Sequence, residues 1–456
     1  MLLVVAAVMH VTIAMALFAA GRAQLAPRLI DRDGLVAAPF SDSYEYQHDA
    51  VWLTNVLRAR GVAEWARRSA PAHVRMLSLA FAVLGPVVGH GILAAEPINL
   101  ACYVAIVALV LAIGREVGGP RAGLAAAVVV MLWPTFLVST MQFLKDPPFI
   151  AAMLALVLVV TTWLTRAYRW SDAVVAGVAV MLAAALLLTV RARFLPVVVA
   201  LALFGAALLV ARQIAERRVL RWNCACALSV IVVGSVPFAR GGRTIEKVAA
   251  YPSRETGQPK SSVGSDVALR ASVVWRRAEG ATPNGAPEAP NGGAARAHRL
   301  RQLVDRAAWS LGDVRRRFNV DNLGAGSAID GAVELSTAGD LLRYLPRAMQ
   351  IGLWAPFPSM WLGVGTHVGR SGRLLSGVET LAIYLCQALA LVAIVRAPRR
   401  LAALLLFGVT AFGLTVMGLV VTNVGTLYRF RYGFWVLLVI LGMAGLETLV
   451  QRRSAA

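Results

Sequence analysis

The chain has 456 residues, of which 58% are hydrophobic, and its mean hydropathy is +0.68. These values lie outside the range of soluble globular proteins and within that of polytopic membrane proteins. The formal net charge is +21, from 45 Lys and Arg against 24 Asp and Glu. Because the arginines form short groups between apolar runs, membrane topology explains them and nucleic-acid binding is not expected.

Apolar runs long enough to cross a membrane follow one another through most of the chain. A spanning helix needs about 20 predominantly apolar residues. The runs that meet this condition are 2–20, 97–114, 122–141, 149–165, 173–190, 194–211, 223–239, 378–395, 401–422 and 432–450. The sequence therefore predicts an all-α, polytopic integral membrane protein with about 10–11 transmembrane helices, interfacial helices and one long outer loop.

One further run, 76–95, is apolar enough to span but contains Gly85-Pro86 and Gly89-His90-Gly91. It is either a kinked span or a pair of helices in the membrane interface. If it crosses, Asp42 lies on the cytoplasmic side. If it does not cross, Asp42 lies on the outer side, and this is the arrangement we expect.

Basic clusters recur at every second hydrophilic link, which puts them all on one side of the membrane. They lie at 115–121, 166–169, 212–221, 396–400 and 452–453. The positive-inside bias makes this side cytoplasmic. The outer side then receives the links 145–148, 191–193, 240–377 and 423–433.

These features divide the chain into three parts. Residues 1–239 form an N-terminal membrane module with a candidate catalytic first outer loop at 21–75, and residues 378–456 form the C-terminal membrane helices. Between them, 240–377 is a long outer loop whose Pro- and Gly-rich middle is expected to be disordered. Within this loop, His298–Asn319 has the apolar spacing of a helix, and Leu341–Trp361 has the composition of a segment lying along the membrane surface.

The first outer loop gathers carboxylates directly after the first span. Asp42 stands among aromatic residues in the segment FSDSYEYQHDA. A carboxylate partly withdrawn from water can act as a general base on an acceptor hydroxyl. A solvated acid beside the membrane would have the same sequence, so both interpretations stay open.

A second acid, Asp146, lies in the link Lys145-Asp146-Pro147-Pro148 between two apolar spans. The prolines start the next helix, and an anion near a helix N-terminus is stabilised by the helix dipole. Capping is thus a sufficient reason for Asp146. Alternatively, Lys145 lies near a phosphate and Asp146 near the acceptor or a divalent ion.

Arginines on the outer side are the third candidate group. A charge next to hydrocarbon is costly and often marks a functional site, and arginine offers a planar donor fork suited to phosphate oxygens. The alternative for each is an interaction with lipid headgroups. The candidates are Arg191, Arg193, Arg343, Arg347, Arg429 and Arg431.

Motifs of other chemistries are missing from the sequence. The 6 histidines are scattered and include no HExxH pattern, so no metal ligands are predicted. Walker and GxSxG patterns do not occur either.

Four short segments together resemble the polytopic GT-C-type glycosyltransferases that use polyprenyl-phosphate sugars, in particular the bacterial branch related to protein O-mannosyl- and aminoarabinose transferases. The segments are an early span followed by Asp42-Ser43-Tyr44 and Ala50; Pro134 followed by Lys145-Asp146-Pro147; Arg193 at the start of an apolar helix; and 423–431 before the last span. The resemblance covers about 1–215 well and the last ~120 residues loosely.

The resemblance implies an inverting glycosyltransferase of the bacterial cytoplasmic (inner) membrane that moves a sugar from a polyprenyl-phosphate donor to a glycan, lipid or protein. Asp42 would be the general base and Asp146 a second acid on the same face. Tyr44, Lys145 and the outer arginines would bind substrate, with a divalent cation as a possible cofactor. The resemblance also supports 76–95 as interfacial.

Two other classes remain open. An O-antigen ligase or polymerase also has many spans and a long outer loop, and it would depend on loop residues such as Arg315–Arg317 or Arg343. A transporter or flippase needs polar groups near mid-membrane and commonly has related halves. The span interiors are almost wholly Ala, Val and Leu, which argues against transport.

Overall fold

The computed structural model describes residues 1–36, 42–191, 195–239, 305, 308–320, 327–363, 369–397 and 399–455. In these parts the structure is helical, and isolated β-bridges take the place of sheets. Eight helices are long and apolar enough to cross a membrane, or nine if the bent pair α5–α6 is one span. The prediction of an all-α polytopic membrane protein is confirmed.

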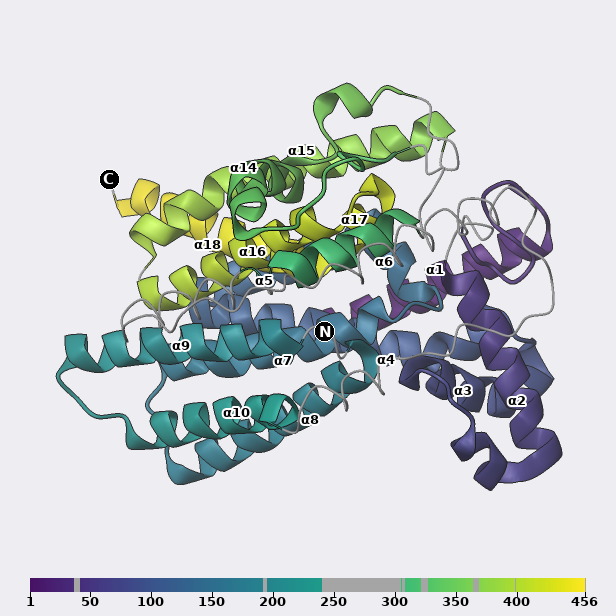
Figure 1. The fold of residues 1–456 in the computed structure, drawn as a ribbon, viewed down its shortest axis with the longest axis horizontal. Helices are drawn as coiled ribbons and strands as arrows, with labels where there is room; N and C mark the ends of the chain where they lie inside the picture. Colours follow the sequence, from purple (N-terminus) through teal and green to yellow (C-terminus); the bar gives the residue numbers. More distant parts are fainter. Residues whose placement is uncertain are drawn as a thin grey trace, which may run out of the picture.

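Each predicted span corresponds to helical structure. The N-terminal part contains α1 (Leu2–Arg22), α4 (Ile92–Gly118), α5 (Pro120–Met131), α6 (Pro134–Met141), α7 (Asp146–Thr165), α8 (Trp170–Arg191), α9 (Leu195–Glu216) and α10 (Arg221–Ala239). The C-terminal part contains α15 (Gly369–Arg396), α16 (Arg400–Val420), the short α17 (Val424–Phe430) and α18 (Tyr432–Ala455). Figure 1 shows the long helices running side by side along the longest axis of the molecule.

The predicted span 122–141 is not one straight helix. It is divided into α5 and α6, which are bent by 65° at a break. Pro134 is the cause, because it opens α6 and disfavours a helical conformation for Trp133, whose φ and ψ are −71° and 110°.

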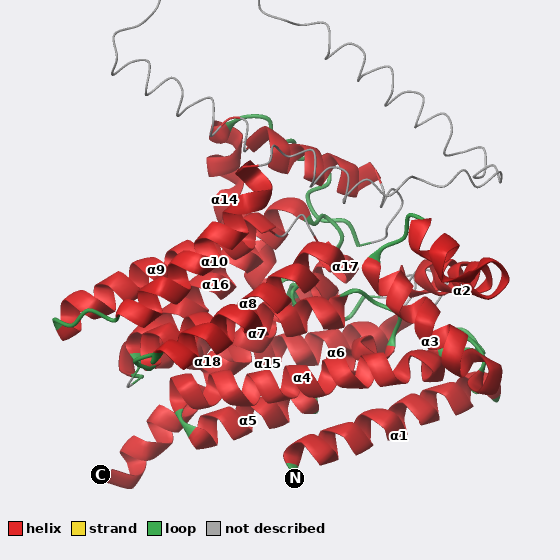
Figure 2. Ribbon diagram, turned by 90° about the horizontal axis from the view of Figure 1, so that it is seen from below, coloured by secondary structure: helices red, strands yellow, loops and turns green. Residues whose placement is uncertain are grey.

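The run 76–95 is also divided. It begins within α3 (Ala72–Val88), which ends at Gly89 with a φ of +78°, and it finishes in the first turn of α4. At about 1.5 Å per residue, α3 is shorter than the hydrocarbon core of a bilayer. α3 packs against α2 (Asp42–Arg67), and both lie together at one end of the bundle, on the right in Figures 1 and 2.

The basic links meet at the other end of the bundle, which we call the basic end (left in Figure 1). Glu116 at the end of α4 forms an ion pair with Arg166 after α7, and Arg399 before α16 lies 3.5 Å from the same carboxylate. Arg212 of α9 donates hydrogen bonds of 2.8 Å to the carbonyls of Trp163 and Arg166. The prediction that the basic links lie together on one side of the bundle is confirmed. That this side is cytoplasmic stays a prediction.

In the long loop, the structure describes a helix at 308–320, α14 (Ala338–Trp354) and the short turn η3 (Pro358–Met360). α14 begins with a capping box between Thr337 and Asp340 and packs closely on α16, where a Cβ on Gly352 would lie 2.1 Å from the carbonyl oxygen of Leu414. The Pro- and Gly-rich middle, 281–297, lies outside the described residues. Whether α14 lies in the membrane surface stays a prediction.

The two ends of the bundle should face opposite sides of a membrane. With the native cysteines replaced, we expect Tyr44→Cys in α2 and Val219→Cys in the α9–α10 link to react with a membrane-impermeant maleimide from opposite sides. Both positions are exposed, at 53% and 80%. Labelling of sealed vesicles before and after permeabilisation measures this. Reaction of both cysteines from one side would contradict the topology.

Candidate active site

The site begins with Asp146, the first residue of α7. The sequence Asp-Pro-Pro starts a helix well, and it leaves the carboxylate at the bundle end opposite the basic end. Its side chain is only 4% exposed and forms an ion pair with Arg191, the last residue of α8. A buried carboxylate that lost this partner would be strongly destabilising, so the pair ties α7 to α8.

Asp42 joins this pair through Arg429. One nitrogen of Arg429, Nη2, lies 2.5 Å from Oδ2 of Asp42, and its Nε lies 3.3 Å from Oδ2 of Asp146. The short helix α17 thus places one guanidinium between an acid of α2 and an acid of α7. The Asp42 side chain is 43% exposed, against 4% for Asp146, so Asp42 is the acid that a ligand can reach.

Aromatic rings fix the cations of this cluster. The guanidinium of Arg191 lies 4.8 Å from the ring centre of Phe149 and 4.5 Å from that of Phe430. The ammonium of Lys145 lies 5.6 Å from the ring centre of Tyr46 in α2. Such cation–π contacts strengthen where water is excluded, and they orient the donors without neutralising them.

The cluster carries a net charge of +1, since three cations (Lys145, Arg191 and Arg429) outnumber the two carboxylates Asp42 and Asp146. Burial alone would raise the pKa of Asp42, but Arg429, with Lys145 and Arg191 beyond it, outweighs burial and holds the pKa below its ordinary value of 3.8. Burial and the neighbouring Arg191 lower the pKa of Lys145 against the opposite pull of the two carboxylates. A positive, partly dry site of this kind suits an anionic ligand such as a phosphate.

The structure brings together Asp42, Asp146, Lys145, Arg191 and Arg429 from the sequence candidates and places others elsewhere. Tyr44 is exposed on α2. Arg343 and Arg347 are exposed on α14, where Arg347 pairs with Asp330 at 2.9 Å. Arg193 lies outside the described residues.

Arg431 also lies outside the cluster, although it is two residues from Arg429. It is fully buried, it donates hydrogen bonds of 3.3 and 2.9 Å to the carbonyls of Ile351 and Gly352, and its guanidinium stacks on the ring of Trp435. Side chains two residues apart on a helix point in directions roughly 200° apart, so they lie on nearly opposite faces. The position therefore suits Arg431 for holding the end of α14 rather than for binding a ligand.

The arginines that the ligase alternative requires have structural contacts as well. Arg315 is 1% exposed and donates hydrogen bonds to the carbonyls of Asp330 at 2.6 Å and Leu419 at 2.8 Å. Its two neighbours, Arg316 and Arg317, pair with Asp313 on their own helix. These contacts tie the loop to α16 and do not join the charged cluster.

Three residues of the site region were not among the candidates predicted from the sequence. Tyr46 and His73 contact each other edge to face, with ring centres 4.4 Å apart, next to Lys145. Glu379 of α15 accepts hydrogen bonds from the backbone N–H of Thr135 at 2.9 Å and from the hydroxyl of Tyr428. Glu379 interrupts an apolar helix and could have been singled out on that ground, whereas nothing in the sequence distinguishes His73.

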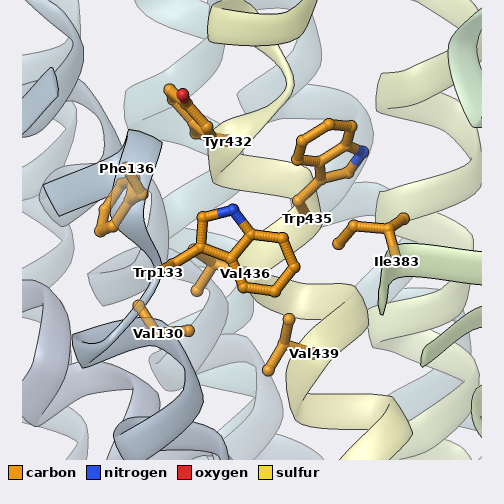
Figure 3. Close-up of a pocket in the computed structure, with 8 residues that line it drawn as sticks. All are labelled: Val130, Trp133, Phe136, Ile383, Tyr432, Trp435, Val436 and Val439. Carbon is orange, nitrogen blue, oxygen red and sulfur yellow. The ribbon is translucent and has the colours of Figure 1, made fainter. Parts of the chain in front are cut away.

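A small apolar pocket lies where α5 bends into α6 (Figure 3). Its wall is rich in aromatic rings, and the lining residues are Val130, Trp133, Phe136, Ile383, Tyr432, Trp435, Val436 and Val439. The ring of Tyr432 packs at 5.9 Å against that of Tyr428, the residue before Arg429. Tyr432 therefore links the lining of the pocket at this bend to α17, which contains Tyr428.

Within the described parts of the chain, no three His, Cys, Asp or Glu side chains converge as metal ligands. Asp42 and Asp146, the acids nearest to a possible cation site, are both paired with guanidinium groups. No residue is therefore assigned to a divalent cation.

The fold and the cluster define a class: a multi-pass, all-α membrane protein with a charged site at the bundle end opposite its basic links. Comparison with protein families, with curated proteins and with solved structures found no match for this chain.

Proposed function

We propose that this protein is an inverting membrane glycosyltransferase that moves a sugar from a polyprenyl-phosphate donor to an acceptor hydroxyl. Its site would lie on the outer face of a bacterial cytoplasmic membrane, with the basic end in the cytoplasm. The observation that carries the proposal is the bridge of Arg429 between Asp42 and Asp146, with Arg191 and Lys145 beside it. The resemblance of four segments to GT-C-type enzymes adds the substrate class.

In the proposed reaction, Arg191, Arg429 and Lys145 bind the phosphate of the donor. The acceptor oxygen attacks the anomeric carbon from the face opposite to the phosphate, and the bond from this carbon to the phosphate oxygen breaks. The leaving group departs as polyprenyl phosphate, and Asp42 takes the proton of the acceptor hydroxyl. Although the pKa of Asp42 is low, this transfer is feasible because the hydroxyl proton becomes acidic as its oxygen forms the new bond.

The two acids would have different roles. Asp42 is accessible and can meet the acceptor, whereas Asp146 is buried and holds Arg191 and Arg429 in place. Fixed donors directed at a charge that develops on the leaving group are a large source of catalysis in sites of low dielectric constant.

Binding of polyprenyl phosphate to the purified protein in nanodiscs tests this proposal. We expect saturable binding by the wild-type protein, weakened about tenfold by Arg191→Lys, which keeps a cation beside Asp146 and removes the planar donor fork for the phosphate. Arg343→Lys is the matched control, because this arginine is exposed on α14 outside the cluster, and it should bind like the wild type. Absence of binding, or equal effects of the two substitutions, would refute the proposal.

A further inference from the structure

His73, in the first turn of α3, has no assigned role in the reaction above. Its side chain is buried, with the residue only 5% exposed, and its ring stands edge-on to the ring of Tyr46 at 4.4 Å. Neither ring nitrogen has a hydrogen-bond partner among the residues that the structure describes. Because a buried polar group without a partner costs about 1–3 kcal/mol, an imidazole with two such nitrogens indicates a ligand or a solvent molecule beside it.

The surroundings of His73 belong to the charged cluster. The ring of Tyr46 contacts both the imidazole of His73 and the ammonium of Lys145. Lys145, Arg191 and Asp42 are all near enough to act on the charge of the imidazole. His73 therefore lies next to the charged cluster, on the side formed by α2 and α3.

The imidazole is neutral in this setting. Burial, together with the positive charges of Lys145 and Arg191, lowers the pKa of His73 to about 3. A neutral imidazole has one N–H donor and one acceptor nitrogen. A phosphate offers only acceptors at neutral pH and already has three cations nearby, whereas a hydroxyl group both donates and accepts and can match either nitrogen.

We propose that His73 binds a substrate hydroxyl, of the donor sugar or of the acceptor, and so sets the specificity of the site. This inference rests on the proposed function and deepens it. It assigns the phosphate to the arginine side of the cluster and the hydroxylated part of the substrate to the α3 side.

Two substitutions of His73 separate hydrogen bonding from packing. His73→Phe keeps a ring against Tyr46 and removes both nitrogens, whereas His73→Gln keeps one donor and one acceptor. His48→Phe, at an exposed histidine of α2, is the control. The measurements are the Kd for polyprenyl phosphate, the Kd for the same lipid carrying the sugar, and the KM for the acceptor.

We expect His73→Phe to bind polyprenyl phosphate within about twofold of wild type and to lose about tenfold in one hydroxyl-dependent constant, equivalent to roughly 1.4 kcal/mol. A weaker Kd for the sugar-bearing lipid assigns the donor hydroxyl, and a higher KM assigns the acceptor hydroxyl. His73→Gln should recover part of the loss.

Equal constants for His73→Phe and wild type would overturn the inference while leaving the proposed function intact. So would weaker binding of the lipid without sugar, because His73 would then serve the phosphate or the packing. If the wild-type protein itself does not bind polyprenyl phosphate, the proposed function is refuted, and this inference with it.

Discussion

Asp42→Asn should lower sugar transfer by about a thousandfold while leaving donor binding nearly unchanged, since a positioned general base contributes roughly 10²–10⁴ in rate. The amide keeps the size of the side chain but cannot take the acceptor proton. Arg429 would remain paired with Asp146, so the cluster should stay assembled. Single-turnover transfer with a labelled donor measures the chemical step.

The matched control is Glu45→Gln, which removes an exposed carboxylate from the same first turn of α2. It should transfer sugar at the wild-type rate. A rate for Asp42→Asn within tenfold of wild type would remove Asp42 from the mechanism.

The pH dependence of the same reaction follows from the lowered pKa of Asp42. A carboxyl group whose pKa is lower in the folded than in the unfolded protein stabilises the fold at pH values above its unfolded-state pKa. This stabilisation is lost as the pH falls through its folded-state pKa. Because the folded pKa lies below 3.8, Asp42 stays ionised down to about pH 4. The transfer rate should therefore show no loss from protonation of Asp42 between about pH 5 and 8.

The second large effect is expected at Glu379, and it concerns stability. Its carboxylate is 4% exposed and accepts hydrogen bonds from the N–H of Thr135 at 2.9 Å, the hydroxyl of Thr135 at 2.5 Å and the hydroxyl of Tyr428. Glu379→Ala leaves the buried hydroxyl of Tyr428 and the half-buried donors of Thr135 without this acceptor, which should lower the free energy of unfolding by about 3 kcal/mol. Because Tyr428 precedes Arg429, transfer activity should fall as well.

Tyr428→Phe removes one of the three donors and keeps the ring, so its cost should be only about 1 kcal/mol. Glu447→Ala is the control, because this carboxylate of α18 has exposed partners, Arg121 at 3.9 Å and the side-chain amide of Gln451 at 2.7 Å, and such exposed contacts contribute little. Reversible denaturation in detergent micelles measures all three. Equal stability losses for Glu379→Ala and Glu447→Ala would contradict the role of Glu379 as the anchor of α17.

The fold was predictable from the sequence because hydropathy depends on runs of residues. Ten apolar runs correspond to helices, and the position of the basic groups at alternate links correctly indicated one common end. The bend between α5 and α6 was missed, since a hydropathy window averages over Pro134. The division of 76–95 at Gly89 required the backbone conformation, which an apolar sequence does not determine.

The site was predictable only in part, because the sequence did not show which face of a helix each candidate occupies. Asp42 and Asp146 were expected in one compartment from topology, and the structure joins both to Arg429. Arg429 and Arg431 looked equivalent in sequence, yet only one of them faces the cluster. His73 was missed because a lone histidine acquires meaning only from its neighbours.

The bridge made by Arg429 also bears on how the protein is made. Its contact with Asp42 joins residues 387 positions apart, one in α2 and the other in α17. During synthesis Asp146 can pair with Arg191 early. The guanidinium of Arg429, which contacts both acids, becomes available only when α17 has been made. A polypeptide truncated before α17 would insert into the membrane and still lack an assembled centre, so activity should arise only after α17 has been synthesised.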